Sequence, residues 1–306
     1  MKVLVATDKP FAKAATDGIR KIVEAAGYEL ALLEKYTDVN DLYAAVADAD
    51  ALIVRSDKVT QAVIDAAKQL KIVVRAGAGY DNLDLAACSA RGIVAMNTPG
   101  QNSNAVAELA LGMMVYMARN SFQLGTGSEL KGKKLGIHAY GNVGKLVSHI
   151  AKGFGMEIYA FDPFVPAEVI EKDGAKAVSS VEELYSTCNY ISLHIPATAE
   201  TKQSIGYNLL SKIPKGGCLV NTARKEVIHE AELASVLEER ADLKYITDII
   251  PDSHADLQAK FGTRYFSTPK KMGAETAEAN VNAGLASANQ IVAFLTKGDK
   301  KFQINK

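Results

Sequence analysis

A glycine-rich segment in the middle of the chain has the residue types that bind a dinucleotide. Residues 136–144 read Gly-Ile-His-Ala-Tyr-Gly-Asn-Val-Gly, between a run that predicts a strand and a run that predicts a helix. Gly141 would let the backbone approach a pyrophosphate, and Gly144 would let the helix pack closely against the strand. Ala139 stands where the G-x-G-x-x-G pattern has its first glycine, and its methyl group is tolerable there if its φ stays negative. The segment predicts an anion site at the helix N-terminus.

Asp162 is placed to bind the ribose of the same dinucleotide. It lies 21 residues after Gly141, at the end of the next predicted strand, and no arginine follows it closely. A carboxylate at this distance hydrogen-bonds the ribose hydroxyls and repels the additional phosphate of NADP. The predicted cofactor is therefore NAD. The alternative interpretation is an ordinary strand–turn–helix corner without a ligand.

The composition is that of an ordinary soluble globular protein. The chain has 306 residues, 48% of them hydrophobic and 23% charged, and Lys+Arg and Asp+Glu both number 35. Proteins that bind nucleic acid or membrane surfaces normally carry a basic excess, so we expect neither partner. The N-terminus lacks the order of a signal peptide, and the three cysteines are expected to be buried free thiols. We therefore expect a cytoplasmic protein without a metal site.

Two series of alternating strand-like and helix-like runs surround these residues. The predicted strands are 3–5, 30–33, 51–54, 72–74 and 93–96 in the first series and 135–139, 157–161, 190–193, 218–220 and 245–249 in the second. Helix-length stretches with apolar residues at steps of three and four separate the strands. This alternation is typical of parallel sheets covered on both faces. We therefore predict an α/β fold with two Rossmann-like parallel-sheet domains.

Two turn-rich segments separate the series. Residues 97–100 (Asn-Thr-Pro-Gly) end the first series, and residues 267–269 (Ser-Thr-Pro) precede a closing amphipathic helix over 276–295. We expect this closing helix to return to the first domain.

Five further segments carry a family resemblance. In chain order they are Val54-Arg55-Ser56, Arg75-Ala76-Gly77-Ala78-Gly79-Tyr80-Asp81-Asn82, Met96-Asn97-Thr98-Pro99-Gly100-Gln101-Asn102, Ile191-Ser192-Leu193-His194-Ile195-Pro196 and Val220-Asn221-Thr222-Ala223-Arg224. With them, nearly the whole chain resembles the D-isomer-specific 2-hydroxyacid dehydrogenases, and among these the phosphoglycerate dehydrogenases. The resemblance implies two Rossmann-like domains with a cleft between them. It implies a discontinuous substrate-binding domain (1–97 and 276–306) and an NAD-binding Rossmann domain (98–275).

The resemblance also implies individual roles. Arg224 would hold the substrate carboxylate and 2-oxygen, which suits the always charged fork of a guanidinium, whereas a solvated loop arginine is the alternative. The other residues implied at the substrate are Arg55, Ser56, Arg75, Ala76, Gly77, Ala78, Gly79 and Asn102. Those implied at NAD are Tyr140, Gly141, Asn142, Val143, Gly144, Asp162, His194, Pro196, Thr201, Thr222, Ala223, Arg224, Asp248 and Gly273.

Arg55 and Arg75 each end an apolar strand, where a charge is costly unless it is paired. A substrate phosphate would supply the partner for both. Salt bridges to local carboxylates are the alternative.

Two departures from the family pattern concern the catalytic acid and base. The family usually places a histidine directly after Thr-Pro and before a glycine, but residues 268–276 read Thr-Pro-Lys-Lys-Met-Gly-Ala-Glu-Thr. Counting back from Gly273 puts Lys271 in that place, and counting forward from Pro269 puts Lys270 there. We prefer Lys271, because the downstream match fixes the register of the closing helix. His254 is the remaining rival.

The carboxylate that orients the family's histidine is also missing. It should follow Asp248 by a few residues, but Asp252 is out of register and no glutamate is present. A lysine needs no carboxylate to fix an imidazole tautomer, so the two losses are coherent. The pattern resembles the subgroup of phosphoglycerate dehydrogenases that uses lysine.

The resemblance implies NAD-dependent oxidation of D-3-phosphoglycerate to 3-phosphohydroxypyruvate, with Lys271 as acid and base and Arg224 as the substrate-orienting residue. The alternatives are the same chemistry on glycerate, hydroxypyruvate or lactate, and a non-catalytic NAD-binding protein. The resemblance also implies a homodimer formed through the long helix predicted over 104–119. Because the chain ends soon after its closing helix, we expect no inhibition by L-serine through a C-terminal regulatory domain.

Overall fold

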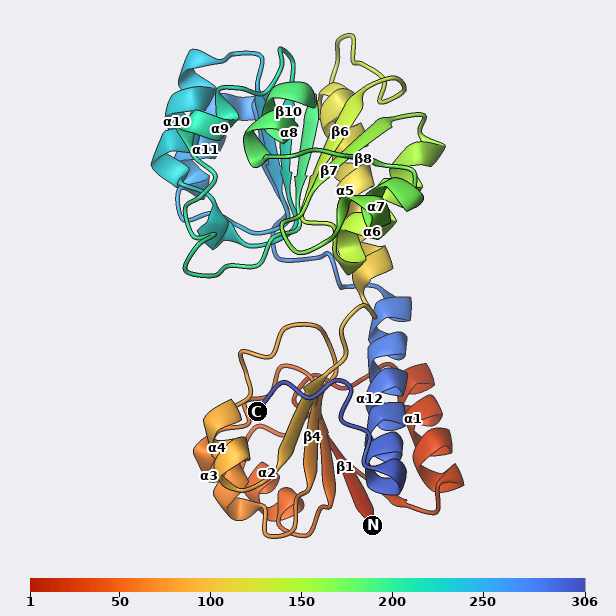
Figure 1. The fold of residues 1–306 in the computed structure, drawn as a ribbon. Helices are drawn as coiled ribbons and strands as arrows, with labels where there is room; N and C mark the ends of the chain where they lie inside the picture. The colour runs from red at the N-terminus through yellow and green to blue at the C-terminus, as the bar shows by residue number, and fades with distance from the viewer. Residues whose placement is uncertain (306) are drawn as a thin grey trace. The chain divides into compact units, whose positions relative to one another are not determined.

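The computed structural model describes residues 1–305, which form two compact units (Figure 1). The first unit contains residues 1–102 together with the chain from Thr276 onward, and the second contains Ser103–Glu275. Between the strand that ends at Asn97 and the helix that begins at Ser103 the chain forms turns, and the units divide at the end of these turns. The first division therefore lies five residues after the expected boundary at residue 97.

The first unit is a five-stranded parallel sheet with the strand order β2-β1-β3-β4-β5. The strands are β1 (Lys2–Thr7), β2 (Glu29–Glu34), β3 (Ala51–Val54), β4 (Ile72–Arg75) and β5 (Val94–Asn97). The helices are α1 (Lys13–Ala25), α2 (Val39–Val46), α3 (Gln61–Ala66), α4 (Leu85–Ala90) and α12 (Ala277–Lys297). Helices α1 and α12 pack side by side on one face of the sheet, and α2, α3 and α4 cover the other (Figure 1).

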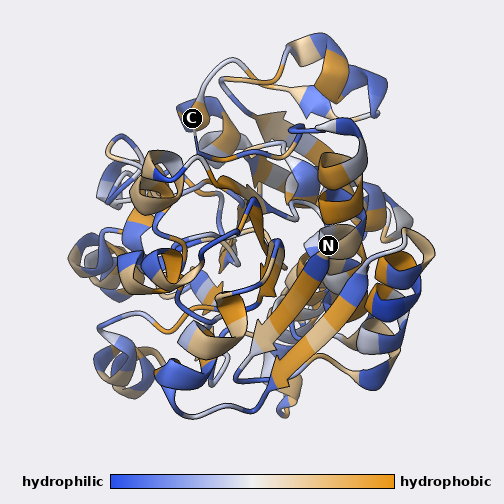
Figure 2. Cartoon of the chain, turned by 90° about the horizontal axis from the view of Figure 1, so that it is seen from below, coloured by the Kyte–Doolittle hydropathy of each residue, from blue (hydrophilic) through white to orange (hydrophobic). Residues whose placement is uncertain are grey.

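Hydrophobic spacing explains this arrangement. Helix α1 buries Ala15, Ile19 and Val23, which recur every four residues and so form one apolar face. All four residues of β3 are buried, as expected for a strand covered on both sides. In Figure 2 the strands beside the N-terminus are mostly in the hydrophobic colour, whereas the helices mix both kinds of residue. The strand ends, including Arg55 and Arg75, are thereby held on a rigid sheet.

The C-terminal segment covers the edge of this sheet. Gln303 forms an antiparallel bridge with Met96 of β5. The buried Asn305 accepts a hydrogen bond from Ala95 N at 2.7 Å and donates one to Ile93 O at 2.8 Å. The segment therefore satisfies backbone groups that an edge strand would otherwise expose.

The second unit is a seven-stranded parallel sheet with the order β12-β11-β10-β9-β6-β7-β8. The strands are β6 (Lys134–His138), β7 (Glu157–Phe161), β8 (Lys176–Ala177), β9 (Tyr190–Leu193), β10 (Cys218–Asn221), β11 (Lys244–Thr247) and β12 (Tyr265–Ser267). The helices are α5 (Ser103–Ala118), α6 (Asn142–Gly153), α7 (Ala167–Lys172), α8 (Val181–Thr187), α9 (Tyr207–Leu210), α10 (Glu230–Glu239) and α11 (His254–Phe261). Helices α5, α6 and α7 cover one face and α8 to α11 the other (Figure 1).

Two parallel sheets with helices on both faces confirm the predicted α/β fold class. Two short strands, β8 and β12, were not predicted. The strands β8 and β12 have only two and three residues, too few for a recognisable periodicity. Among residues 1–305, no helix combines the length and apolar composition that a bilayer crossing requires.

Candidate active site

The predicted dinucleotide corner joins β6 to α6. Gly141 is the N-cap of α6, and no side chain caps the helix, so the N–H groups of its first turn point out of the helix without an intrahelical partner. A Cβ added to Gly141 would meet nothing within 4 Å, so the space beside its backbone is open. A Cβ added to Gly144 would overlap the carbonyl oxygen of Ala139. The open space beside Gly141, the free N–H groups of the first turn and the close packing at Gly144 fit a bound pyrophosphate.

Ala139 does not have the negative φ that we expected from the sequence. Its φ is +79°, in the left-handed region, whereas the tolerance of its methyl group was expected to depend on a negative φ. An L-residue pays about 1–2 kcal/mol for this conformation, which glycine adopts without penalty. Ala139 therefore adopts a backbone conformation that favours glycine, and its backbone is strained.

Asp162 links this corner to the end of β7. Its Oδ2 accepts a hydrogen bond from Tyr140 N at 2.7 Å, and its Oδ1 accepts one from Phe164 N at 2.8 Å. A carboxylate offers about four lone-pair sites, so two remain for ribose hydroxyls. The carboxylate thus fits the predicted role while it also fixes the two turns.

Two largely buried histidines lie beside one another at the ends of β6 and β9. The backbone N–H of His194 donates to the carbonyl of His138 at 2.9 Å, and the His194 Nε2 and Ser192 Oγ atoms are 3.0 Å apart. Burial lowers the pKa of His138 to about 4, against a smaller opposing effect of Asp162. Burial, and then the charge of His138, lowers the pKa of His194 to about 3. Both imidazoles are therefore neutral at pH 7.

The loop after β10 carries Thr222, Ala223 and Arg224. The Asn221 side chain holds this loop, since its Oδ1 accepts from Ala223 N and its Nδ2 donates to Arg224 O, each at 2.9 Å. Thr222 Oγ1 is buried and has no hydrogen-bond partner among residues 1–305. Arg224 Nη1 donates to Ala223 O at 2.8 Å, and no carboxylate of the described chain pairs with the guanidinium. The loop therefore offers a hydroxyl and several guanidinium donors to a ligand.

The loop after β9 contains the predicted residues Pro196 and Thr201. Thr201 Oγ1 donates to Pro196 O at 2.5 Å and accepts from Thr198 N at 2.7 Å. The hydroxyl therefore closes this loop, and its role in the structure is to fix the backbone.

Asp248 follows β11 and is completely buried. Its Oδ1 accepts hydrogen bonds from Thr268 Oγ1 at 2.9 Å and from Met272 N at 2.8 Å, and its Oδ2 accepts one from Gly273 N at 2.8 Å. Lys271 directly precedes Met272. The carboxylate predicted at the cofactor is therefore bonded to the segment that carries the predicted base.

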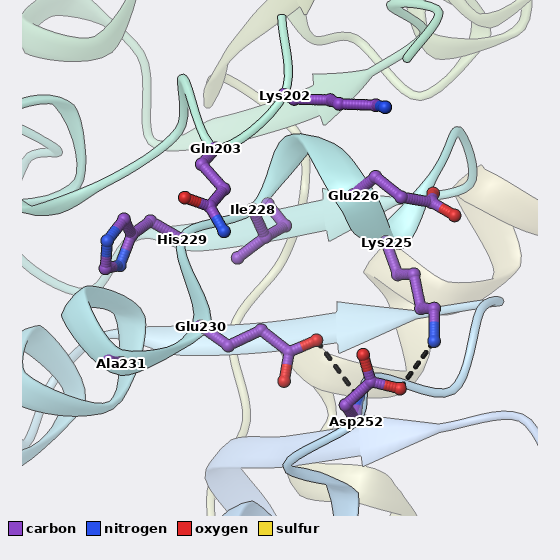
Figure 3. Close-up of a pocket in the computed structure, with 9 residues that line it drawn as sticks. All are labelled: Lys202, Gln203, Lys225, Glu226, Ile228, His229, Glu230, Ala231 and Asp252. Carbon is purple, nitrogen blue, oxygen red and sulfur yellow. Dashed lines mark hydrogen bonds and ion pairs between the residues drawn. The ribbon is translucent and has the colours of Figure 1, made fainter.

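A cavity of about 670 Å³ opens among the loops that follow β9, β10 and β11 (Figure 3). None of the predicted site residues lines it. Lys225 and the exposed Asp252 form an ion pair of 2.5 Å on its wall. Glu230, which the sequence did not single out, accepts hydrogen bonds from Asp252 N at 3.0 Å and from Ser253 N at 2.8 Å. Its only sequence signal is its place in the first turn of α10, and it braces the turn after β11.

His254, the alternative to Lys271 as acid and base, contacts Tyr265. Its Nδ1 lies 2.8 Å from the hydroxyl of the buried Tyr265, and the two rings are 5.7 Å apart. This contact gives His254 a packing role at the start of α11.

In the first unit, Arg55 and Arg75 lie at the ends of neighbouring strands. Arg55 donates to Asn280 Oδ1 at 2.6 Å and to the carbonyls of Lys9 and Pro10, and it lies 5.3 Å from the Phe11 ring centre. Arg75 Nε donates to Arg55 O at 3.1 Å. Burial, and then the charge of Arg55, lowers the pKa of Arg75. No salt bridge within residues 1–305 includes either arginine, although the nearby charge of Asp81 partly offsets the lowering of the Arg75 pKa.

The loop after β4 contains the small residues Ala76 to Gly79. The N–H groups of Ala78 and Gly79 have no hydrogen-bond partner within the described residues. Gly77 has a φ of +150°, and a Cβ there would overlap the Arg75 guanidinium. Successive unpaired N–H groups beside a cation fit an anion. Ser56 is exposed, and Asn102 is half-buried at the end of this unit's first segment without a described hydrogen bond.

Comparisons with known proteins place the chain in a family. Residues 112–264 match the family model of the D-isomer specific 2-hydroxyacid dehydrogenase, NAD binding domain. A structure of cofactor (NAD+)-bound 3-phosphoglycerate dehydrogenase from Entamoeba histolytica has 51% identity and a TM-score of 0.88, with 100% of this chain and 99% of that chain covered.

Two curated relatives agree. D-3-phosphoglycerate dehydrogenase of Methanocaldococcus jannaschii is 37% identical over 83% of this chain and 51% of its own length. Hydroxypyruvate reductase of Thermotoga maritima is 37% identical over 67% of this chain and 70% of its own length. The chain thus spans about half the length of several curated phosphoglycerate dehydrogenases that it matches. It belongs to the family of D-isomer-specific 2-hydroxyacid dehydrogenases, as the sequence segments predicted.

Proposed function

We propose that this protein is an NAD-dependent dehydrogenase that interconverts D-3-phosphoglycerate and 3-phosphohydroxypyruvate, a reaction that supplies serine synthesis. The observation that carries the proposal is the pair Arg55 and Arg75. Two guanidinium groups at adjacent strand ends, neither of them in a salt bridge within residues 1–305, favour a doubly charged anion. A phosphate on the substrate meets this need, whereas the only anionic group of lactate and glycerate is the carboxylate that we assign to Arg224.

The second unit supplies the cofactor site. Gly141 and the first turn of α6 would hold the pyrophosphate, Asp162 the ribose, and Thr222 a polar group of the nicotinamide half. NAD, when bound, accepts hydride from the substrate carbon that bears the hydroxyl. The neutral His138 and His194 add no charge to this region at pH 7.

Two groups of the second unit would act on the substrate. Arg224 binds the carboxylate and the 2-oxygen through its unpaired donors and so orients the reacting carbon. Lys271 takes the hydroxyl proton during oxidation and returns a proton to the oxygen during reduction. Lys270 is the alternative for this place, because the segment is one residue longer than the family pattern.

A second candidate function is reduction of hydroxypyruvate, the activity named for the Thermotoga relative. The discriminating experiment measures NADH oxidation with phosphohydroxypyruvate, hydroxypyruvate and pyruvate under the same conditions. We expect kcat/KM to be highest for phosphohydroxypyruvate by about tenfold or more, the usual effect of a charge-assisted contact. A preference for hydroxypyruvate would favour the second candidate, and no turnover with any of the three would favour a non-catalytic NAD-binding protein.

We also propose that a second copy of the chain is the protein partner. Helix α5 is apolar on most sides, and the loop that follows it exposes 70% of Phe122 and all of Leu124. Exposed apolar side chains next to an apolar helix are typical of an interface between subunits. Sedimentation at micromolar concentration should give the mass of a dimer, and replacing Phe122 and Leu124 with Ser should shift it to the monomer mass.

A further inference from the structure

The segment between β12 and α12 contains Lys270 and Lys271 and has neither helix nor strand. A segment of this kind has no ladder of backbone hydrogen bonds to hold its shape. Its shape must therefore come from contacts with neighbouring groups. Three of the described contacts are made by one side chain, that of Asp248.

Asp248 bonds to this segment on both sides of the two lysines. Thr268 Oγ1 donates to Oδ1 before them, and Met272 N and Gly273 N donate to Oδ1 and Oδ2 after them, all at 2.8–2.9 Å. The carboxylate is completely buried, and no salt bridge of the described chain includes it. A buried carboxylate is tolerated only when hydrogen bonds satisfy it, and bonds to a charged acceptor are stronger than neutral ones.

Gly273 gives an independent observation of the same contact. A Cβ on Gly273 would lie 3.0 Å from Asp248 Oδ2 and 3.2 Å from Val106 Cγ2. The backbone therefore lies so close to the carboxylate that an added methyl group would require a shift of a few tenths of an ångström.

We propose that Asp248 is a positioning residue that fixes the backbone around Lys271, in addition to its predicted contact with NAD. Because groups on both sides of the two lysines bond to one carboxylate at the end of β11, Asp248 holds the backbone that carries Lys271. The inference rests on the proposed function, in which Lys271 is the base.

The test compares Asp248→Asn with a matched control, Asp252→Asn. Asparagine keeps the size of Asp248 but presents an NH2 group to one of the donors, which disrupts the contact. Asp252 lies on the same connection after β11, is exposed and pairs with Lys225, so its replacement changes charge without touching residues 268–273. We expect Asp248→Asn to lower kcat by about tenfold or more, a loss separate from any rise in KM for NADH that the predicted cofactor contact would cause, with Asp252→Asn unchanged. If Lys271 is the base, the oxidation rate of the parent should rise into the alkaline range, because a lysine amine has a reference pKa of about 10.4. This rise should flatten in Asp248→Asn and in Lys271→Ala.

A double variant separates positioning from a direct cofactor role. If Asp248 acts through Lys271, the variant with both Asp248→Asn and Lys271→Ala should be no slower than Lys271→Ala alone, because coupled residues are not additive. A raised KM for NADH at unchanged kcat, or additive losses, would overturn the positioning role. In that case parent turnover would remain and the proposed function would stand.

A readout without turnover keeps the inference testable if the proposed reaction fails. Trypsin cleaves after Lys270 and Lys271, and cleavage requires the segment to open. The folded Asp248→Asn protein should be cut there about tenfold faster than the parent and Asp252→Asn. Equal cleavage rates would overturn the inference. If Asp248→Asn does not fold, Gly273→Ala, which pushes on the same carboxylate from the other side, should show the same kcat loss and faster cleavage, and normal values for both would overturn it.

Discussion

The guanidinium of Arg75 lies across the α-carbon of Gly77, where a methyl group would overlap its Nη1 atom. This contact explains why a glycine follows the strand end by two residues. It also ties the loop after β4 to the position of the arginine that we propose to hold the substrate phosphate.

Replacing Gly77 with Ala should therefore act like a loss of Arg75. We expect KM for phosphohydroxypyruvate to rise by about tenfold, because the displaced guanidinium no longer reaches the phosphate. Steady-state kinetics check this, with KM for NADH as an internal reference. Gly92→Ala is the control for backbone strain, since Gly92 has a φ of +66° and open space around it. An equal rise of KM in both variants would mean that strain, and not displacement of Arg75, is the cause.

Because the backbone of Ala139 is strained, we expect Ala139→Gly to have little effect on stability. Ala139→Gly relieves a positive φ that costs about 1–2 kcal/mol, which offsets the lost methyl group and the added chain entropy. We expect the free energy of unfolding in urea to stay within about 0.5 kcal/mol of the parent or to rise. The exposed Ala255 of α11 has helical backbone, and Ala255→Gly should lower that free energy by about 1 kcal/mol. Equal losses at both positions would contradict the strain at Ala139.

The buried histidines predict acid sensitivity. Because the pKa values of His138 and His194 in the folded protein are about 4 and about 3, the unfolded chain binds more protons below its ordinary histidine pKa near 6.5. The two neutral histidines make their full contribution to the free energy of unfolding above about pH 6.5. As the pH falls below this value, that free energy decreases by up to about 1.4 kcal/mol per pH unit for each histidine.

Urea unfolding at pH 7.5, 6 and 5 measures this effect. His138→Gln should reduce the fall of stability over this range, whereas His149→Gln, at an exposed position on α6, should not. A parent slope that His138→Gln leaves unchanged would show that other groups cause the acid sensitivity.

Lys271→Ala should cut kcat by about a hundredfold or more, the usual effect of a lost general acid or base, with little change in NADH binding. The parent's oxidation rate should climb into the alkaline range, because a lysine amine has a reference pKa of about 10.4. Lys270→Ala and His254→Ala are the controls. A near-normal kcat in Lys271→Ala together with a large loss in one control would assign the proton transfer to that neighbour.

Local patterns were enough to predict the sheets and the glycine corner. Apolar runs such as Ala51–Val54 and Tyr190–Leu193 are buried strands at the predicted positions, because strands covered on both faces need continuous apolar sequence. Gly141 and Gly144 lie at the start of α6, as predicted from their spacing between a strand-like run and a helix-like run.

Contacts between distant residues could not be predicted in this way. Nothing near Asp248 in the sequence indicates that its carboxylate bonds to a segment more than twenty residues later. Glu230 bonds to the turn at Ser253 and Asn305 to β5 across similar or longer separations. The positive φ of Ala139 is set by the strand and helix that it joins, and neither composition nor spacing reports it. The roles of Arg224 and Lys271 stay predictions.

Arg55 and Arg75 are the residues that we propose to recognise a phosphate on the substrate. The most direct measurement is KM for phosphohydroxypyruvate and for hydroxypyruvate in the parent, Arg55→Ala and Arg75→Ala. Arg91→Ala is the control, because Arg91 already donates to the carbonyls of Ile64 and Ala67 and pairs with Asp65. We predict that each of the first two variants raises KM for the phosphorylated substrate by about tenfold or more while KM for hydroxypyruvate and NADH stays nearly constant. Equal changes for both keto acids, or no change for either, would contradict this proposal.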